Sequence, residues 1–194
     1  EVGFIGRVLL NAFNAWEYSW QCGREDLKEN SMKVFDSYLK NGFTQAGFFK
    51  ESVNFDRGYE DPVHSIRRQS EGVYAMLHFL AYERENGRRH PEWEQKMKNM
   101  LDILLQLQHE DGSFPRKFHD DFTVVDNSGG STPSATLPLI MGYKYFKDKR
   151  YLASAKRTAD YLEKVLISKA DYFSSTLDAN CEDKEASLYA ATAT

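Results

Sequence analysis

The sequence has little of several features that point to particular classes of protein. Its two cysteines, Cys22 and Cys181, are far apart among 194 residues. We therefore expect free thiols and neither a disulfide framework nor a zinc site. No apolar run approaches the roughly 20 residues of a membrane-spanning helix. The net charge of −4 gives no broad basic field, which argues against nucleic acid as the main partner.

Motifs for metal and phosphate chemistry are missing as well. The chain has no HExxH pattern, no cysteine-rich cluster and no glycine-rich phosphate loop, so we expect neither a metal nor a cofactor. It begins at Glu1 and not at a methionine. Any targeting signal would therefore have been removed or never included, and the residues do not identify the compartment.

What the chain does contain is a recurring unit of helix, polar loop and second helix. The clearest copy starts at Met97, passes through the loop 110–116 and enters an apolar helix at 134–139. Ser70 suits a helix N-cap, and Pro91 suits a first helical position. A long ordered loop is predicted over 43–66. The spacing of apolar residues predicts helices over 4–20, 25–40, 70–85, 91–108, 133–146, 151–167 and about 182–194.

Small residues such as Gly72, Ala135 and Gly142 gather in the first helix of each pair, whereas the second helices carry more Lys, Glu and Asp. The first helices are thus expected to be crowded at a centre and the second to form an outer ring facing water. A helical pair cannot bury its apolar face alone, so an array is implied. We predict an all-α toroid of helical hairpins, with an ordinary helical bundle as the alternative. About three and a half hairpins are present, and residues 1–194 are expected to form part of a single domain that continues beyond 194 and packs against the remainder of its own toroid.

Several phrases resemble the six-hairpin (α/α)6 glycosidase-like superfamily. They are the run 104–108 followed by Asp111-Gly-Ser-Phe114, the Gly129-Gly-Ser-Thr132 opening of the next helix, and the outer-helix phrases 150–155 and 159–162. The resemblance implies a ring of six inner and six outer helices, of which this chain supplies about half. It also favours a periplasmic or secreted bacterial location. Terpenoid cyclases and prenyltransferase subunits share a related toroid, but their aspartate-rich motif is absent here.

Carboxylates collect in the loops that lead from an outer helix to the next inner helix, and these loops are expected to share one face. Glycoside hydrolysis needs two carboxyl groups, one protonated and one ionised. We predict Asp111, Asp126 and Glu182 as the catalytic candidates. Each has a simpler interpretation: an Asp-Gly turn for Asp111, a turn before a helix for Asp126, and compensation of a helix dipole for Glu182.

Cations and aromatic residues near the same loops are the candidates for substrate binding, since arginines and inner-helix N-termini both favour anions. An acidic or oxidised sugar is therefore our hypothesis for the ligand. His64 and His119 are in the same loops, where an isolated histidine is usually solvated. The predicted substrate-binding residues are Arg67, Arg68, Glu71, Phe114, Arg116 and Asp178.

The sequence thus favours a carbohydrate-active enzyme, and most specifically a glycoside hydrolase that uses carboxylate acid/base catalysis on an oligosaccharide or polysaccharide substrate, including one that contains uronic acid. Two alternatives stay open, since a fold does not establish an activity. The first is a polysaccharide lyase. The second is a toroid that binds glycans or serves as a scaffold without catalysis.

Overall fold

The computed structural model describes residues 4–54, 56–128, 131–170 and 184–193. Helices make up most of this part of the chain, and short strands occur only in the connections between them. The α-helices are α1 (Ile5–Cys22), α2 (Glu25–Asn41), α3 (Ile66–Glu85), α4 (Pro91–Leu107), α5 (Pro133–Phe146), α6 (Lys149–Tyr161) and α7 (Lys184–Ala193). The strands are β1 (Val53–Asn54), β2 (Tyr59–Glu60), β3 (His64–Ser65), β4 (Lys117–Phe118) and β5 (Val124–Asp126).

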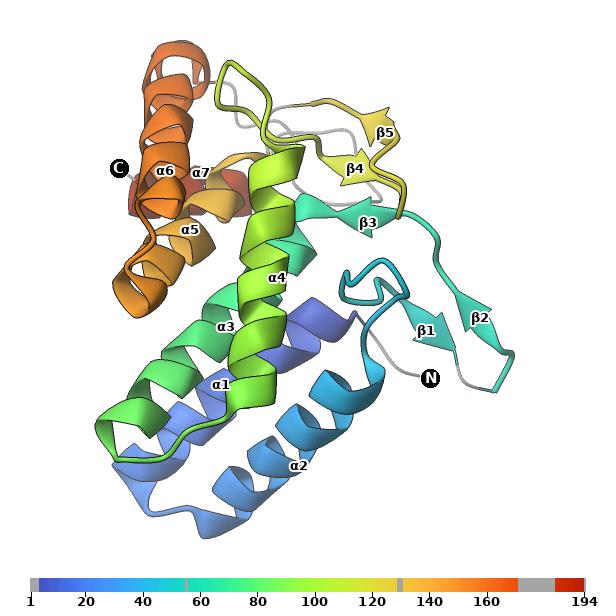
Figure 1. The fold of residues 1–194 in the computed structure, drawn as a ribbon, viewed down its shortest axis with the longest axis vertical. Coiled ribbons are helices and arrows are strands. Elements are labelled where there is room, and N and C mark those ends of the chain that lie inside the picture. The colour runs from blue at the N-terminus through green and yellow to red at the C-terminus, as the bar shows by residue number, and fades with distance from the viewer. Residues whose placement is uncertain (1–3, 55, 129–130, 171–183, 194) are drawn as a thin grey trace.

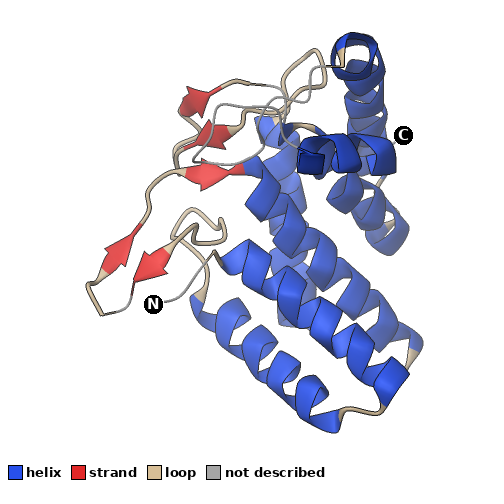
Figure 2. Cartoon of the chain, turned by 180° about the vertical axis from the view of Figure 1, so that it is seen from behind, coloured by secondary structure: helices blue, strands red, loops and turns tan. Residues whose placement is uncertain are grey.

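The helices form two layers, as the distribution of small residues predicts. The odd-numbered helices pack on one another in succession, α1 on α3, α3 on α5 and α5 on α7. The even-numbered helices cover them, with α2 on α1, α4 on α3 and α5, and α6 on α5. Figures 1 and 2 show this arrangement from opposite sides, with the strands gathered at one end of the helices. This is the architecture of a helical-hairpin toroid.

Glycines allow the inner helices to approach closely. A Cβ at Gly6 of α1 would lie 1.8 Å from the carbonyl oxygen of Arg68 on α3, and a Cβ at Gly72 would lie 3.0 Å from the Cα of Gly6. Both contacts involve backbone atoms, which cannot turn away as a side chain can. The α1–α3 crossing therefore requires these two glycines, of which the sequence argument identified only Gly72.

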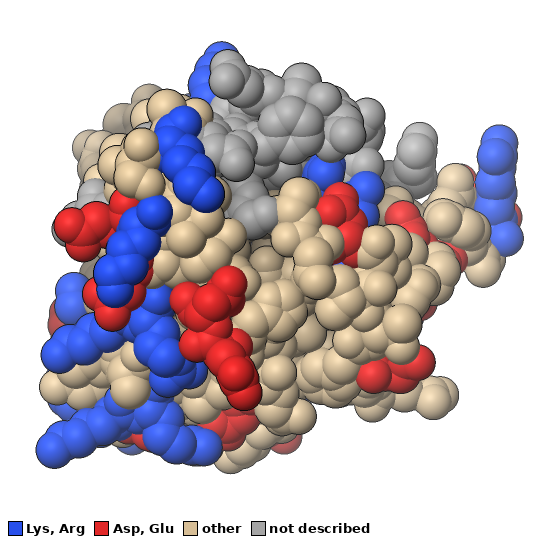
Figure 3. Space-filling model, turned by 90° about the horizontal axis from the view of Figure 1, so that it is seen from above, with Lys and Arg blue, Asp and Glu red and all other residues tan. Residues whose placement is uncertain are grey.

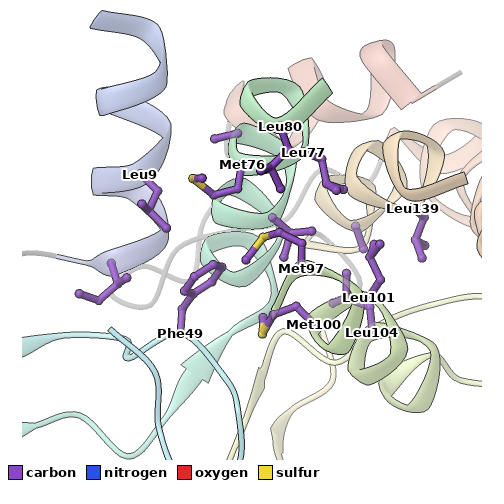
Figure 4. Close-up of a cluster of buried hydrophobic side chains, with 14 of the residues drawn as sticks. Leu9, Phe49, Met76, Leu77, Leu80, Met97, Met100, Leu101, Leu104 and Leu139 are labelled. Carbon is purple, nitrogen blue, oxygen red and sulfur yellow. The ribbon is translucent and has the colours of Figure 1, made fainter. Parts of the chain in front are cut away.

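One hydrophobic core joins the two layers. Leu9 of α1, Met76 of α3 and Met97 of α4 are each fully buried in it. Figure 4 shows these side chains with Leu101 and Leu104 of α4, which lie close to Leu139 of α5. The apolar stripe of α4 thus faces inward, as expected for an amphipathic outer helix. The core holds the inner helices in fixed positions, and with them the polar residues at their ends.

Three details differ from the sequence predictions. The segment 43–66 contains β1, β2 and β3, so it is only partly a loop. The helix predicted from Ser70 begins at Ile66, because β3 runs directly into α3; Ser70 is buried inside the helix and is not its cap. The helix predicted over 151–167 ends at Tyr161 and continues as a π-helical turn over Leu162–Leu166 and a 3-10 turn over Ile167–Lys169.

The start of α3 shows why the prediction was displaced. Its first backbone donors are satisfied by distant residues and not by a capping side chain: Ser65 N–H donates to Glu51 Oε2 at 3.0 Å, and Ile66 N–H donates to the carbonyl of Arg116 at 3.2 Å. Local sequence signals carry no trace of such tertiary caps. Among the described helices, none is both long and apolar enough to cross a membrane.

Candidate functional site

A small sheet joins two connections that are far apart in sequence. Strand β3 pairs antiparallel with β4, His64 opposite Phe118, and β4 pairs antiparallel with β5, Lys117 opposite Asp126. The loops that precede α3 and α5 therefore meet at the N-terminal end of the inner helices, as the sequence argument expects. We call this end of the molecule the mouth. Figure 3 looks onto it from above and shows acidic and basic side chains side by side.

A buried carboxylate lies just inside the mouth, on the second turn of α3. Glu71 Oε1 accepts hydrogen bonds from Arg67 Nε at 2.9 Å and from the Tyr189 hydroxyl at 2.6 Å, and Arg7 Nη2 lies 2.9 Å from the same oxygen. These partners come from α1, α3 and α7. The side chain of Glu71 is only 2% exposed, so two guanidinium groups balance its charge away from bulk water.

The second oxygen of this carboxylate is differently placed. Glu71 Oε2 and Ser70 Oγ are both buried and have no hydrogen-bond partner among the described residues. Both residues line a cavity of about 70 Å³, together with Tyr74, Ser134 and Tyr189. Burial and the neighbouring charge of Glu71 raise the pKa of Tyr189, so its hydroxyl remains a donor at neutral pH. One carboxylate oxygen is fixed by the protein, and the other is buried and keeps an unused acceptor capacity among the described residues.

A second ion pair lies in the sheet. Arg116 Nη1 lies 3.0 Å from Asp126 Oδ2, and Asp126 Oδ1 accepts the backbone N–H of Ser128 at 2.8 Å. Burial acts to raise the pKa of Asp126, but the hydrogen bonds from Ser128 and the positive charges of Arg116 and Lys117 outweigh it and lower that pKa. The carboxyl of Asp126 is therefore ionised at neutral pH and about 29% exposed.

Arg68 points away from these two groups. Its Nη1 donates to Glu51 Oε1 at 2.7 Å, and its guanidinium lies 3.2 Å from the centre of the Phe4 ring. Burial raises the pKa of Glu51 to about 7, although Arg68 and the Ser65 N–H both act to lower it. Arg68 therefore fastens the 43–63 segment to α3, and its predicted role in substrate binding stays a prediction.

Asp111 is part of a tight turn on the outer side of the array. Its Oδ1 accepts the backbone N–H of Ser113 at 3.0 Å and the Ser113 hydroxyl at 2.6 Å, and these hydrogen bonds lower the pKa of Asp111. Gly112 has φ +92°, and a Cβ there would lie 2.2 Å from the carbonyl oxygen of Arg157 in α6. The geometry matches the Asp-Gly turn interpretation.

The neighbouring Gln108 is hydrogen-bonded both to this loop and to α6. Its side-chain amide donates to the Ser154 carbonyl at 3.0 Å and to Thr158 Oγ1 at 2.9 Å, and it accepts from the Ser154 hydroxyl at 2.7 Å. It also donates to the Gly112 carbonyl at 3.2 Å. Gln108 thus binds the loop to α6, the next outer helix, and we refer to it as the Gln108 clamp.

Phe114 needs a correction. The sequence places it beside a sugar, but its ring is fully buried in the hydrophobic core, and its N–H donates to Thr132 Oγ1 at 3.0 Å. A ring without exposed surface offers no face to a ligand in this conformation. The remaining two predicted site residues, Glu182 and Asp178, lie outside the described residues.

Three residues at the mouth were missed or misjudged from the sequence. Arg7 and Tyr189 were not candidates, because nothing local marks them. His64, predicted to be solvated, is 1% exposed and stacks on Phe48, and its Nε2 lies 2.7 Å from Asp120 Oδ1. The signal for His64 was available: it precedes a helix in a segment rich in aromatic residues. In the described part of the chain, no three His, Cys, Asp or Glu side chains are grouped as a metal site requires.

The fold is shared with solved structures of sugar-processing proteins. No known family profile matches the chain. An unsaturated glucuronyl hydrolase from a Bacillus species has a TM-score of 0.69 at 15% identity, covering 97% of this chain and 53% of that one. A cellobiose 2-epimerase from Bacillus thermoamylovorans has a TM-score of 0.66 at 16% identity, covering 82% and 40%.

A D-mannose isomerase is similar to the same degree, with a TM-score of 0.68 and 14% identity over 86% of this chain and 42% of its own. The chain thus has the (α/α)6 toroid fold that the sequence predicts, and it spans about half the length of the proteins it matches. At these identities the likeness establishes the architecture alone.

Proposed function

We propose that the protein is a carbohydrate-active enzyme whose active site lies at the mouth, and that it hydrolyses glycosidic bonds. The observation that carries the proposal is the Glu71 carboxylate: one oxygen is fixed by three donors, and the other is buried without a hydrogen-bond partner among the described residues, in a side chain that lines a cavity of about 70 Å³. A sugar hydroxyl placed there would give Oε2 the hydrogen bond that it lacks. The three similar proteins are a hydrolase, an epimerase and an isomerase of sugars by name, which supports a saccharide substrate.

The carboxylates would have different roles in the reaction. Asp126, with its lowered pKa and partial exposure, is suited to act as the ionised base or nucleophile. Glu71 is suited to bind substrate, because three donors already engage one of its oxygens. The protonated partner is proposed to be Glu182, as the sequence suggests. Arg67 and Arg116 would attract a carboxylated sugar to the mouth. In this proposal Asp111 has a structural task in the Asp-Gly turn.

The test is a set of single substitutions in the full-length protein, assayed on neutral and uronic oligosaccharides. We expect Asp126→Asn to lower kcat by about a hundredfold or more, and Glu71→Gln to raise KM and lower kcat/KM by about tenfold or more. Asp111→Asn is the matched control, since it lies in the same set of loops, and its kcat should stay within about twofold of the parent. Full activity in Asp126→Asn would refute the proposed role.

A sugar epimerase or isomerase is the second candidate, because the similar structures include proteins named as a cellobiose 2-epimerase and a D-mannose isomerase. Chromatography of the products separates the alternatives. A hydrolase releases shorter sugars with new reducing ends, a lyase adds the absorbance of a new C=C bond, and an epimerase changes the sugar without changing the chain length. No turnover of any saccharide, together with retained binding, would indicate a glycan-binding scaffold.

A further inference from the structure

The β4–β5 hairpin at the mouth contains a strained turn. Phe122 has φ +68°, in the left-handed region, which is unfavourable for a residue with a bulky side chain. Its N–H donates to the carbonyl of His119 at 2.9 Å, and the N–H of His119 donates to the carbonyl of Thr123 at 2.9 Å. Such a conformation persists only where neighbouring contacts hold it.

The strands of the hairpin supply little of this support. β4 is held on its other side by β3, whereas β5 is the edge strand of the sheet. The register between β4 and β5 shifts at Lys117 and Phe118, and no side chain of β5 is buried in the described part of the chain. A strand pair this short is marginal by itself. The contacts of the turn are therefore needed to fix β5.

Hydrogen bonds join the turn to two segments that precede α3. Asp120 Oδ1 lies 2.7 Å from His64 Nε2 of β3 and accepts the Thr44 hydroxyl at 3.0 Å. Next to it, His119 Nδ1 lies 3.0 Å from the carbonyl oxygen of Pro62. The side chain of Asp120 is about half exposed, whereas that of His64 is 1% exposed. The buried imidazole is thus the fixed partner of this pair.

The His64 imidazole is held by aromatic packing and has one polar contact. Its ring stacks on Phe48 with ring centres 4.9 Å apart, and the ring centre of Phe118 is 5.7 Å away. Its Nδ1 is buried and has no hydrogen-bond partner among the described residues. Because a carboxylate oxygen accepts, Nε2 carries the hydrogen and donates it to Asp120. A ring buried in this way is suited to hold Asp120 and not to exchange protons with a substrate.

The turn leads directly into the proposed site. Asp126 is in β5, and its backbone carbonyl accepts the N–H of Arg116 at 2.8 Å. Only residues 119–123 connect the two strands, so a displaced turn moves β5 and the carboxylate with it. We infer that His64 is a positioning residue: its hydrogen bond to Asp120 holds the β4–β5 hairpin so that Asp126 lies beside Arg116. This inference rests on the proposed function for its effect on turnover, whereas the anchoring of the hairpin does not.

Hydrogen exchange of the full-length protein, measured by mass spectrometry on the peptide 116–126, tests the anchoring without any substrate. His64→Phe keeps an aromatic ring in place but cannot donate to Asp120. We expect exchange in this peptide to become about tenfold faster or more, while exchange in peptides from α4 is unchanged. His64→Gln keeps a side-chain N–H donor and should restore slow exchange.

The effect on the reaction is measured with the neutral and uronic oligosaccharides that test the proposed function. We expect His64→Phe to lower kcat by about tenfold or more with KM within about twofold, and His64→Gln to recover most of the loss. Burial acts to raise the pKa of Asp126, and the hydrogen bonds and positive charges around it outweigh that effect. A loosened hairpin weakens these contacts, so the acidic limb of the pH profile of kcat should move to higher pH in His64→Phe.

His90→Phe is the matched control. His90 also stacks on an aromatic ring, that of Trp93 at 4.5 Å, and its Nε2 lies 3.0 Å from Glu83 Oε2. It follows the C-terminal end of α3 and is outside the mouth. Its substitution removes the same kind of contact, and kcat should stay within about twofold of the parent value.

Two results would overturn the inference. One is unchanged exchange in the peptide 116–126 of His64→Phe. The other is a loss of kcat in His90→Phe as large as that in His64→Phe, which would indicate a general loss of stability. Faster exchange in His64→Phe together with full activity in Asp126→Asn would refute the proposed function and support the anchoring of the hairpin.

Discussion

The carboxylates at the two ends of helix α3 differ in burial and in hydrogen bonding. At the mouth, Glu71 is buried and receives donors from three helices. Near the C-terminal end, Glu85 is exposed and has no partner among the described residues, and the aromatic rings beside it are partly open. The first arrangement fixes a carboxylate in one position before any ligand arrives. The second holds Glu85 in no fixed position, because no other described residue bonds to it. One helix thus carries both a fixed carboxylate and an unpaired one.

The largest effect is expected from a substitution at the close crossing of α1 and α3, on which both ends of α3 depend. Gly6→Ala would place a Cβ within 1.8 Å of the Arg68 carbonyl oxygen, so α1 and α3 would have to separate. We expect a loss of about 3 kcal/mol or more in the free energy of unfolding, measured by urea denaturation. Gly87→Ala is the control, since Gly87 has φ +74° but open space around it, and its cost should be about 1 kcal/mol. Equal losses of unfolding free energy in Gly6→Ala and Gly87→Ala would show that α1 and α3 do not pack closely at Gly6.

A smaller effect distinguishes the two ends directly. Arg7→Ala would leave the buried Glu71 carboxylate with one guanidinium instead of two, and we expect a loss of about 2 kcal/mol in unfolding free energy. Glu85→Gln changes a carboxylate of the same helix that has no partner among the described residues, so its unfolding free energy should change by less than about 0.5 kcal/mol. Thermal or urea unfolding of both variants provides the measurement. A loss of unfolding free energy in Glu85→Gln as large as that in Arg7→Ala would contradict the difference between the two ends of α3.

The smallest effect is a pH dependence that comes from Glu51, the partner of Arg68 at the start of α3. The pKa of Glu51 is raised to about 7 in the folded protein, so between its ordinary value and about 7 the folded state binds the proton that the unfolded state has lost. The stability from this group is therefore present at low pH and decreases as pH rises towards 7. Between pH 5 and 7.5, we expect the unfolding free energy of the parent to fall by on the order of 1–2 kcal/mol relative to that of Glu51→Gln. Parallel urea titrations at the two values would contradict this if the difference stayed constant.

The order of the helices and their division into two layers could be predicted from the sequence, because apolar spacing and small residues are local signals. Pro91 begins α4 as expected, and Gly72 lies at the close helix crossing. The mouth could be predicted only in part. Arg67 and Glu71 were identified because they stand near a helix start, but Arg7 and Tyr189 reach Glu71 across 64 and 118 residues of sequence, and such contacts depend on the completed fold.

Asp111 shows the opposite limit of sequence reasoning. Its place beside Gly112, Phe114 and Arg116 suggests chemistry, yet Phe114 is needed by the core and Gly112 by the approach to α6. A polar loop that secures a neighbouring helix and a polar loop that binds a ligand use the same residue types. What distinguishes the two is whether the side-chain atoms have protein partners. The structure gives Asp111 two hydrogen bonds and leaves Glu71 Oε2 without one.

The Gln108 clamp and the β3–β4 pairing have a consequence for how the array folds. In a simple stack of hairpins each unit contacts its neighbour through helix faces, so units can form or melt nearly one at a time. Here a side chain after α4 binds α6, and a strand before α3 pairs with one before α5. The α3–α4 and α5–α6 hairpins are thereby joined at the loops as well as through the core. Partial unfolding of one of these two hairpins would remove hydrogen bonds from the other, so the two should melt in a single cooperative transition that includes the mouth.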